Sequence, residues 1–217
     1  MVRRPPKPPA PPPPAALTSY ADKRDFTVTP EPPPGPIVPA GDGPPAFMIH
    51  KHDARRLHYD LRLEIEGALA SWAVPQGPCF DPAQKRLAVE TEDHPMAYAT
   101  FEGRIPDGEY GAGEALVWDR GLYETVPPGR ASAMRQKGHL DLLFLGEKLK
   151  GRWHLVRTRG PATRASSRPQ WLLMKAKDEY ARDDYDIVTL RPESVISGRQ
   201  LARPPAATAP RRPRPKP

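Results

Sequence analysis

Two histidines and an aspartate stand at short spacing in the first half of the chain, and these residue types can bind a transition metal. His52 precedes His58 by six residues, and Asp60 follows His58 by two. Two imidazoles and one carboxylate form a standard ligand set for a divalent metal ion, and they leave coordination positions open for a substrate. The same spacing also suits solvated polar groups on a protein surface, so both interpretations stay open on spacing alone.

The residues around this group follow the period of a β-strand. Residues 57–65 alternate between apolar and polar types, and side chains two residues apart lie on the same face of a strand. His58, Asp60 and Arg62 should therefore project together, and a turn after His52 could fold its imidazole back beside His58. The guanidinium of Arg62 is suited to phosphate oxygens, which strengthens the interpretation of this face as a metal and phosphate site.

A third histidine is a candidate for proton transfer. His94 lies in the segment Glu92-Asp93-His94-Pro95, after another expected strand, and Tyr98 follows four residues later. An imidazole can act as an acid or a base near neutral pH. His50, His139 and His154 have no ligand partner at useful spacing, so we expect them to have structural or incidental roles.

The elements that would position these residues are mostly short strands. The expected strands are separated by turns that contain Gly and Pro, as in a β-sandwich or a β-barrel. Besides 57–65 they are 47–52, 68–74, 86–90, 114–119, 140–145, 152–157 and 171–175. The four tryptophans fall in these strands and are predicted to be core residues. We expect little helix, near 131–137, and a tight turn at the glycine-rich residues 108–113.

Proline and charge divide the chain into three parts. The sequence has 217 residues and 32 prolines, and its proline-rich ends cannot build a packed core. Residues 1–19 and 199–217 carry nine Lys or Arg and no acidic residue, which leaves 24 basic and 26 acidic residues between them. We therefore expect disordered tails at 1–19 and 199–217 and one domain at 20–198. The basic tails would either attract nucleic acid or act only as solubilising segments.

The number of cysteines and the hydropathy of the sequence indicate the cellular compartment. A single cysteine, Cys79, excludes an internal disulfide framework and suits a reducing environment. No apolar run approaches the roughly 20 residues that cross a bilayer, and a proline tract stands where a signal peptide needs its apolar segment. We expect a cytoplasmic protein with no membrane partner.

Many blocks, in order, resemble the 3′-phosphoesterase module of DNA ligase D over about residues 20–182. The blocks are KRDF at 23–26, TPEP at 29–32, HKHDARRLHYDLRLE at 50–64, SWAVP at 71–75, KRLAV at 85–89, EDHP at 92–95, FEG at 101–103, IPDGEYGAG at 105–113, VWDRG at 117–121, WLLMK at 171–175 and DEYA at 178–181. So many matched blocks in one order are far more specific than any single motif.

The resemblance implies a compact, mostly β fold, a β-barrel of about eight strands with little helix, flanked by Pro-rich tails. It also implies one divalent metal ion, Mn²⁺, bound by His52, His58 and Asp60. The residues that match the family's catalytic and substrate-contacting set are Arg62, His94 and Tyr98, with Arg86 and Glu92 in support, and Arg24, Asp25 and Glu31 for action on a terminal ribonucleotide.

The activity implied by the resemblance is the healing of DNA 3′ ends. Family members remove a terminal ribonucleoside and then the 3′-phosphate from a primer strand, which leaves the 3′-OH needed in non-homologous end joining. The expected partners are primer-template 3′ ends of DNA or ribonucleotide-terminated DNA, together with Ku and separately encoded ligase or polymerase. A nucleoid-associated location would follow.

The sequence departs from the family's pattern at one position, and two alternative functions stay open. The family usually has lysine in Val-Pro-Lys-Gly-Pro, whereas this chain has Gln76, which supplies a dipole in place of a positive charge and puts the phosphate-removing step in doubt. The alternatives are a non-catalytic module that binds DNA ends, and an iron-dependent oxygenase that uses His58, Asp60 and His94 as a facial triad.

Overall fold

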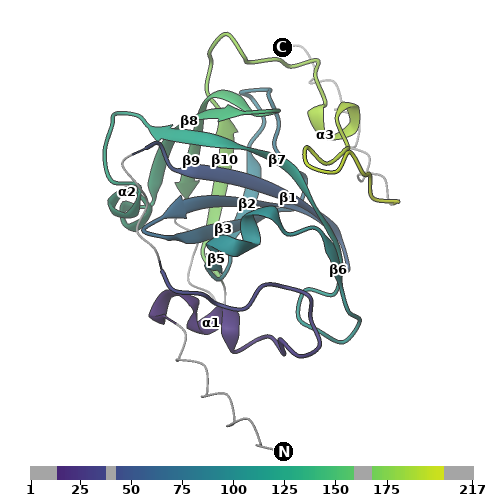
Figure 1. Ribbon diagram of the computed structural model, residues 1–217. Coiled ribbons are helices and arrows are strands. Elements are labelled where there is room, and N and C mark those ends of the chain that lie inside the picture. Colours follow the sequence, from purple (N-terminus) through teal and green to yellow (C-terminus); the bar gives the residue numbers. More distant parts are fainter. Residues whose placement is uncertain (1–13, 38–42, 159–167, 203–217) are drawn as a thin grey trace, which may run out of the picture.

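The computed structural model describes residues 14–37, 43–158 and 168–202 (Figure 1). Eight antiparallel strands form a closed barrel, because the strand order β1-β2-β3-β4-β10-β9-β8-β7 returns to β1 through a β1–β7 pairing. These strands are β1 (Ala46–Asp53), β2 (Leu57–Ile65), β3 (Ala68–Val74), β4 (Arg86–Glu90), β10 (Gln170–Lys175), β9 (Lys150–Arg157), β8 (His139–Gly146) and β7 (Gly113–Thr125). The expected mostly β barrel is confirmed.

Two short strands and a few short helices complete the described elements. β5 (His94–Pro95) pairs with β3, and β6 (Gly103–Ile105) pairs with the first residues of β7. The helical segments are η1 (Ala15–Leu17), α1 (Thr18–Ala21), η2 (Met96–Thr100), α2 (Ala131–Lys137) and α3 (Ile187–Leu190). The glycine-rich residues 108–112 lie in the turn between β6 and β7, as the absence of a helical pattern predicted, and Gly113 is the first residue of β7.

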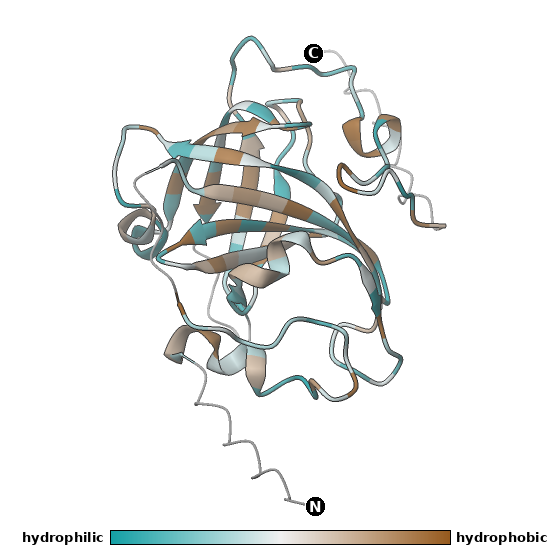
Figure 2. Cartoon of the chain, in the orientation of Figure 1, coloured by the Kyte–Doolittle hydropathy of each residue, from teal (hydrophilic) through white to brown (hydrophobic). Residues whose placement is uncertain are grey.

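The alternation in residues 57–65 separates a core face from a site face. Tyr59, Leu61 and Leu63 are buried and pack in the main core with all four tryptophans, which have no exposed surface. Figure 2 shows the same alternation of hydrophobic and hydrophilic residues along the barrel strands. The opposite face of β2 carries His58, Asp60 and Arg62 outside the barrel.

This outer face is nevertheless covered, because the N-terminal arm (residues 14–37) runs across it, as Figure 1 shows below the barrel. Tyr20 of the arm packs with Met48 of β1, Leu69 of β3 and Tyr98 of η2 in a second apolar cluster. As a result Arg62 is only 3% exposed although it points away from the barrel core. A site that excludes most water can therefore form on the outside of the barrel.

The folded part extends slightly beyond residues 20–198. Residues 15–21 are helical and Leu17 is buried, while Leu201 packs in the main core. Most of the expected tails (1–13 and 203–217) lie outside the described residues. So do most of residues 158–168, whose Gly, Pro and Ser content predicts a loop. Among those described, no helix is both long enough and apolar enough to cross a bilayer.

Candidate metal and phosphate site

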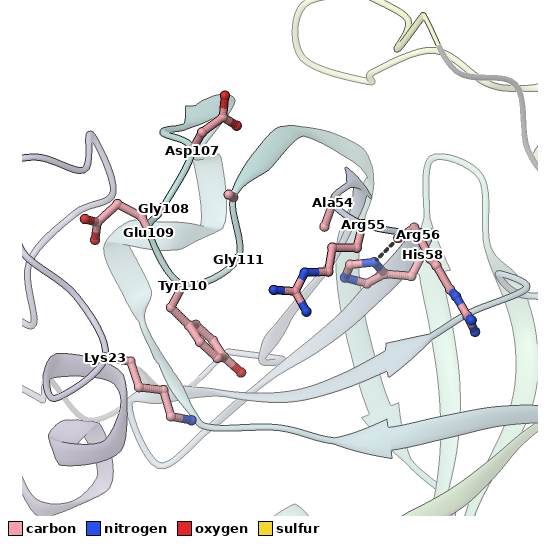
Figure 3. A pocket seen from close by; sticks show the side chains of 11 residues that line it. Lys23, Ala54, Arg55, Arg56, His58, Asp107, Gly108, Glu109, Tyr110 and Gly111 are labelled. Atoms are coloured by element: carbon pink, nitrogen blue, oxygen red, sulfur yellow. Dashed lines mark hydrogen bonds between the residues drawn. The ribbon is translucent and has the colours of Figure 1, made fainter.

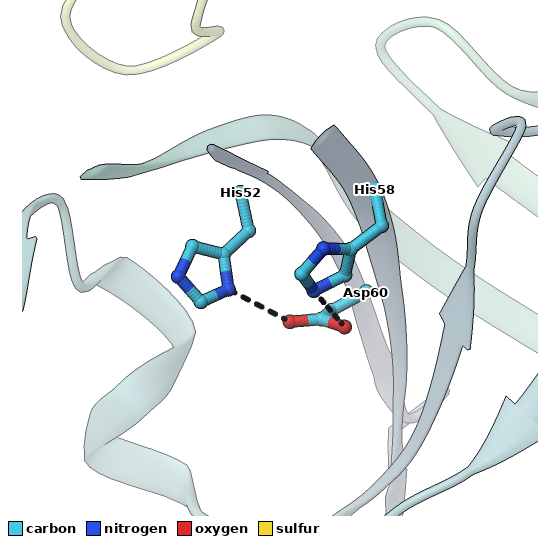
Figure 4. A group of neighbouring side chains, drawn as sticks. All are labelled: His52, His58 and Asp60. Atoms are coloured by element: carbon cyan, nitrogen blue, oxygen red, sulfur yellow. Dashed lines mark ion pairs between the residues drawn. The ribbon is translucent and has the colours of Figure 1, made fainter. Parts of the chain in front are cut away.

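The three predicted metal ligands come together where β1 and β2 meet. His52 and His58 are directly paired across these antiparallel strands, and Asp60 lies two residues along β2. One donor atom from each of the three residues lies within 4.8 Å of the others (Figure 4). The Asp60 oxygens are 3.8 Å from His52 Nδ1 and 3.4 Å from His58 Nε2. The turn at residues 54–56 folds His52 beside His58, as the spacing predicted.

Backbone carbonyls hold both imidazoles in the orientation that a metal requires. His52 Nε2 lies 2.9 Å from the carbonyl oxygen of Gly111, and His58 Nδ1 lies 2.9 Å from that of Arg56. Because a carbonyl oxygen only accepts, each of these nitrogens carries a hydrogen, and the other ring nitrogen faces Asp60. Histidines that bind metals usually donate their second N–H in this way. The donor set therefore fits one divalent ion.

The charges within this group are strongly coupled. Burial lowers the pKa of His58, but the Asp60 carboxylate outweighs burial and raises it to about 9. Burial alone would raise the pKa of Asp60, whereas the charges of His58 and Arg62 hold it well below its usual range. Without a metal, the group is thus an ion pair between a protonated imidazole and a carboxylate.

Arg62 is fixed beside the metal ligands by three neighbours. Its Nη2 donates to Asp60 Oδ2 at 3.0 Å, its Nη1 to Ser71 Oγ at 2.8 Å, and its Nε to His50 Nδ1 at 3.3 Å. The guanidinium also lies 4.8 Å from the ring centre of Tyr98. A guanidinium has five N–H donors, so donors are left for phosphate oxygens. Sequence reasoning missed Ser71 and the role of His50, because both act only through Arg62.

His94 presents an unprotonated nitrogen. Its Nδ1 lies 2.9 Å from the carbonyl oxygen of Glu92 and so carries the hydrogen, while Arg24 Nη2 lies 3.4 Å from Nε2, which can accept. Burial and the guanidinium groups of Arg62 and Arg24 hold the pKa of His94 well below its usual range. The imidazole is therefore neutral at pH 7, and its free lone pair is on Nε2.

The arm residues join this site through two carboxylates. Arg24 Nε donates to Glu31 at 3.0 Å, and its Nη1 lies 3.5 Å from Glu92, which also pairs with Lys23 at 2.9 Å. Arg24, Glu31 and Glu92 line the same cavity as the metal ligands. Asp25 is not brought there: it is exposed and accepts hydrogen bonds from Thr27.

Of the remaining predicted site residues, Tyr98 lines the cavity, whereas Gln76 and Arg86 do not. Tyr98 is buried, stacks edge-on against His94 and lines the cavity, whose volume is about 240 Å³. Gln76 and Arg86 pair with each other, with Arg86 Nη1 donating to Gln76 Oε1 at 2.6 Å, but neither lines the cavity. Arg168 does line it and was missed, since it stands at the end of a segment that sequence describes only as a loop.

Two expectations about histidines need correction. His139 and His154 do have a potential ligand partner, because β8 and β9 pair Asp141 with His154 and bring His139, Asp141 and His154 together. This partner was invisible in the sequence because it depends on strand register. The facial triad expected for an oxygenase is not the group that forms: His52, not His94, joins His58 and Asp60.

Comparisons with known proteins agree with this geometry. Residues 50–157 match the family model of the DNA ligase D 3′-phosphoesterase domain. The chain is 52% identical over 187 residues to the multifunctional non-homologous end joining protein LigD of Pseudomonas aeruginosa and 44% identical over 167 residues to that of Mycolicibacterium smegmatis. The alignments cover 85% and 75% of this chain but only 22% and 21% of those relatives.

The match and the fold place the chain in the phosphoesterase class of hydrolases. More particularly, it belongs to the DNA ligase D 3′-phosphoesterase domain family. The LigD protein of Mycobacterium tuberculosis is 40% identical over 182 residues. The chain spans about a fifth of the length of these relatives, and the alignments with them cover most of this chain.

Proposed function

We propose that this protein is a metal-dependent phosphoesterase that heals DNA 3′ ends. It removes a terminal ribonucleoside and the 3′-phosphate of a primer strand and leaves a 3′-OH. The observation that carries the proposal is the His52, His58 and Asp60 group, oriented by backbone carbonyls, in one cavity with Arg62 and His94. The family match supports the same assignment.

The residues present fit a single divalent ion, for which we propose Mn²⁺. His52 Nδ1, His58 Nε2 and an Asp60 oxygen would hold it. A bound ion would offset the negative charge that builds up on the phosphoryl oxygens during the reaction. His58 must release its Nε2 proton before it can bind the ion, so ion binding and protonation of His58 compete.

The chain's own groups would bind and orient the phosphate. Arg62 and Arg24 line the cavity and offer guanidinium donors, and Tyr98 of η2 lines the same cavity. His94 Nε2 has a lone pair and no hydrogen, so this atom can attack phosphorus or accept a proton, and it cannot donate a proton at first. This geometry supports a role for His94 as a base or a nucleophile over a role as the initial acid.

The named relatives, which are non-homologous end joining proteins, support a proposal for the pathway. We propose that this chain acts in the repair of DNA double-strand breaks, in the cytoplasm and associated with the nucleoid. Its substrates would be primer-template 3′ ends that carry a ribonucleotide or a phosphate. Ku and separately encoded ligase or polymerase are the proposed partner proteins.

Two substrates and a metal chelator test the proposal. A primer-template with a 3′-phosphate should release inorganic phosphate with Mn²⁺ and none with EDTA, and a ribonucleotide-ended primer should become shorter by one nucleoside. Asp60→Asn should abolish both reactions while the protein stays folded. Tight binding of the DNA end without any Mn²⁺-dependent product would instead identify a non-catalytic end-binding module.

A further inference from the structure

A second, larger cavity opens beside the proposed reaction site. Its volume is about 970 Å³, compared with about 240 Å³ for the site that holds the metal ligands. The two cavities share Ala54, His58, Tyr110 and Gly111 as wall residues, so they adjoin at His58. The outer walls of the larger cavity are the turn at residues 54–56 and the turn at residues 107–112.

The larger cavity contains a free positive charge. Arg55 is exposed, and within the described part of the chain no carboxylate forms an ion pair with it. Figure 3 shows its guanidinium extending from the turn toward Tyr110, while the carboxylates of Asp107 and Glu109 point away from it. An unpaired guanidinium at the wall of a cavity suits a phosphate diester, which it can bind with two parallel hydrogen bonds.

The opposite wall presents an aromatic ring. Tyr110 is 39% exposed and lines both cavities, and its hydroxyl accepts a hydrogen bond from Arg168 Nη2 at 2.7 Å. The Lys23 ammonium lies 4.9 Å from the ring centre. Partly exposed aromatic rings between cations are the usual platforms on which single-stranded bases stack.

The direction in which the substrate strand continues indicates what the larger cavity binds. A 3′ end that enters the small cavity has no nucleotide beyond it, so the strand can only continue in the 5′ direction. The small cavity lies below the roughly 300–1,000 Å³ typical of ligand sites and has room only for the reacting end, whereas the larger one lies at the upper limit of that range. A strand that leaves the small cavity through the wall shared at His58 would meet Arg55 and Tyr110.

We infer that the larger cavity binds the nucleotides immediately 5′ of the reacting end, on the same strand. Arg55 contacts a backbone phosphate and Tyr110 stacks against a base. This inference rests on the proposed function and adds to it a subsite for the primer strand that carries no part of the chemistry.

The test compares Arg55→Glu with Arg182→Glu, the same charge change at an exposed arginine that lines neither cavity. The probe is a single-stranded 12-nucleotide DNA with a 3′-ribonucleotide, so that no template strand is present. Fluorescence anisotropy at several salt concentrations gives the Kd, and steady-state kinetics with Mn²⁺ give kcat and KM. Tyr110→Leu and Tyr110→Phe form a second pair, in which only leucine removes the ring.

Arg55→Glu should raise Kd and KM about tenfold and leave kcat unchanged, because a charged hydrogen bond outside the reacting centre is lost. The slope of log K against log salt should fall by about 0.7, the value for one phosphate contact on a single strand. Arg182→Glu and Tyr110→Phe should resemble the wild type in Kd, and Tyr110→Leu should not.

Equal Kd values for Arg55→Glu and Arg182→Glu would overturn the inference, as would a loss in kcat without a change in KM. An effect seen only when a template strand is annealed would show that the cavity does not bind the unpaired primer strand, and it would also contradict the inference. Failure of the proposed function is distinguishable, because wild-type protein would then make no product while anisotropy still reports binding by the cavity.

Discussion

Among the described residues, the barrel carries two groups of two histidines and one aspartate. They have the same kinds of donor atom but differ in burial and in their surroundings. In both groups the donor atoms lie within 4.8 Å of one another. His52, His58 and Asp60 are held between backbone carbonyls, the arm and Arg62, in the wall of a cavity. In the second group His139 is exposed and Asp141 and His154 are partly exposed on β8 and β9, where Arg152 donates to both oxygens of Asp141.

Ligand spacing alone therefore does not make a reaction centre. In the first group each imidazole has its second nitrogen fixed by a carbonyl, so its donor atom is aimed before any ion arrives. The arginine beside each aspartate also differs in burial: Arg62 is buried with donors to spare, and the side chain of Arg152 is 46% exposed. We expect chemistry only where orientation, burial and a neighbouring cavity coincide.

The largest expected contrast is in turnover. His52→Ala should lower Mn²⁺-dependent phosphoesterase activity by at least about a hundredfold, since even loss of a group supporting a metal ligand costs 10–100-fold. His154→Ala, the matched change in the surface group, should retain wild-type activity. Release of the terminal nucleoside from a ribonucleotide-ended primer measures both, and equal losses would remove the distinction between the groups.

A smaller contrast is expected for the two arginines. Arg62→Lys keeps the charge but loses the planar fork that contacts Asp60, Ser71 and His50 together, so kcat should fall by about ten- to a hundredfold. Arg152→Lys changes only an exposed pair with Asp141 and should leave kcat unaltered. Circular dichroism would confirm that both variants are folded. A normal kcat in Arg62→Lys would show that its charge alone suffices.

The difference between the two His/Asp groups could be predicted only in part from the sequence. Period-two alternation predicted that His58, Asp60 and Arg62 share a face, and a short turn predicted the return of His52. The burial of that face was not predictable, because it depends on Tyr20 packing onto Tyr98 and Leu69 from a distant part of the chain. Likewise the pairing of Asp141 with His154 depends on the register of β8 and β9, which periodicity does not set.

A modest effect is expected at Gln76. A 3′-phosphomonoester carries more negative charge than a phosphodiester, so Gln76→Lys should favour phosphate removal over nucleoside removal. Because Gln76 lies outside both cavities and accepts a hydrogen bond from Arg86, we expect a change in the rate ratio of at most about tenfold. The assay uses matched primers with either end. An unaltered ratio would mark Gln76 as a neutral departure from the family.

The smallest expected effect is a difference in protonation between His58 and His154 in the metal-free protein. The Asp60 carboxylate overcomes burial and raises the pKa of His58 to about 9, so its imidazole should stay protonated at pH 7 and 8 and lose the proton near pH 9. Partial burial outweighs the attraction of Asp141 and lowers the pKa of His154 below its ordinary value, so that ring should be neutral at pH 7. NMR titration of the histidine rings in EDTA-treated protein checks both, and a neutral His58 at pH 7 would contradict the ion pair.

The most direct test of the central assignment is the binding of Mn²⁺ to the metal-free full chain, followed by the EPR signal of the free ion. We expect one tight site per chain, lost in His52→Ala, His58→Ala and Asp60→Ala and retained in His139→Ala and His154→Ala. Unchanged binding in the first three variants, or loss of the tight site in the last two, would place the metal elsewhere and contradict the assignment.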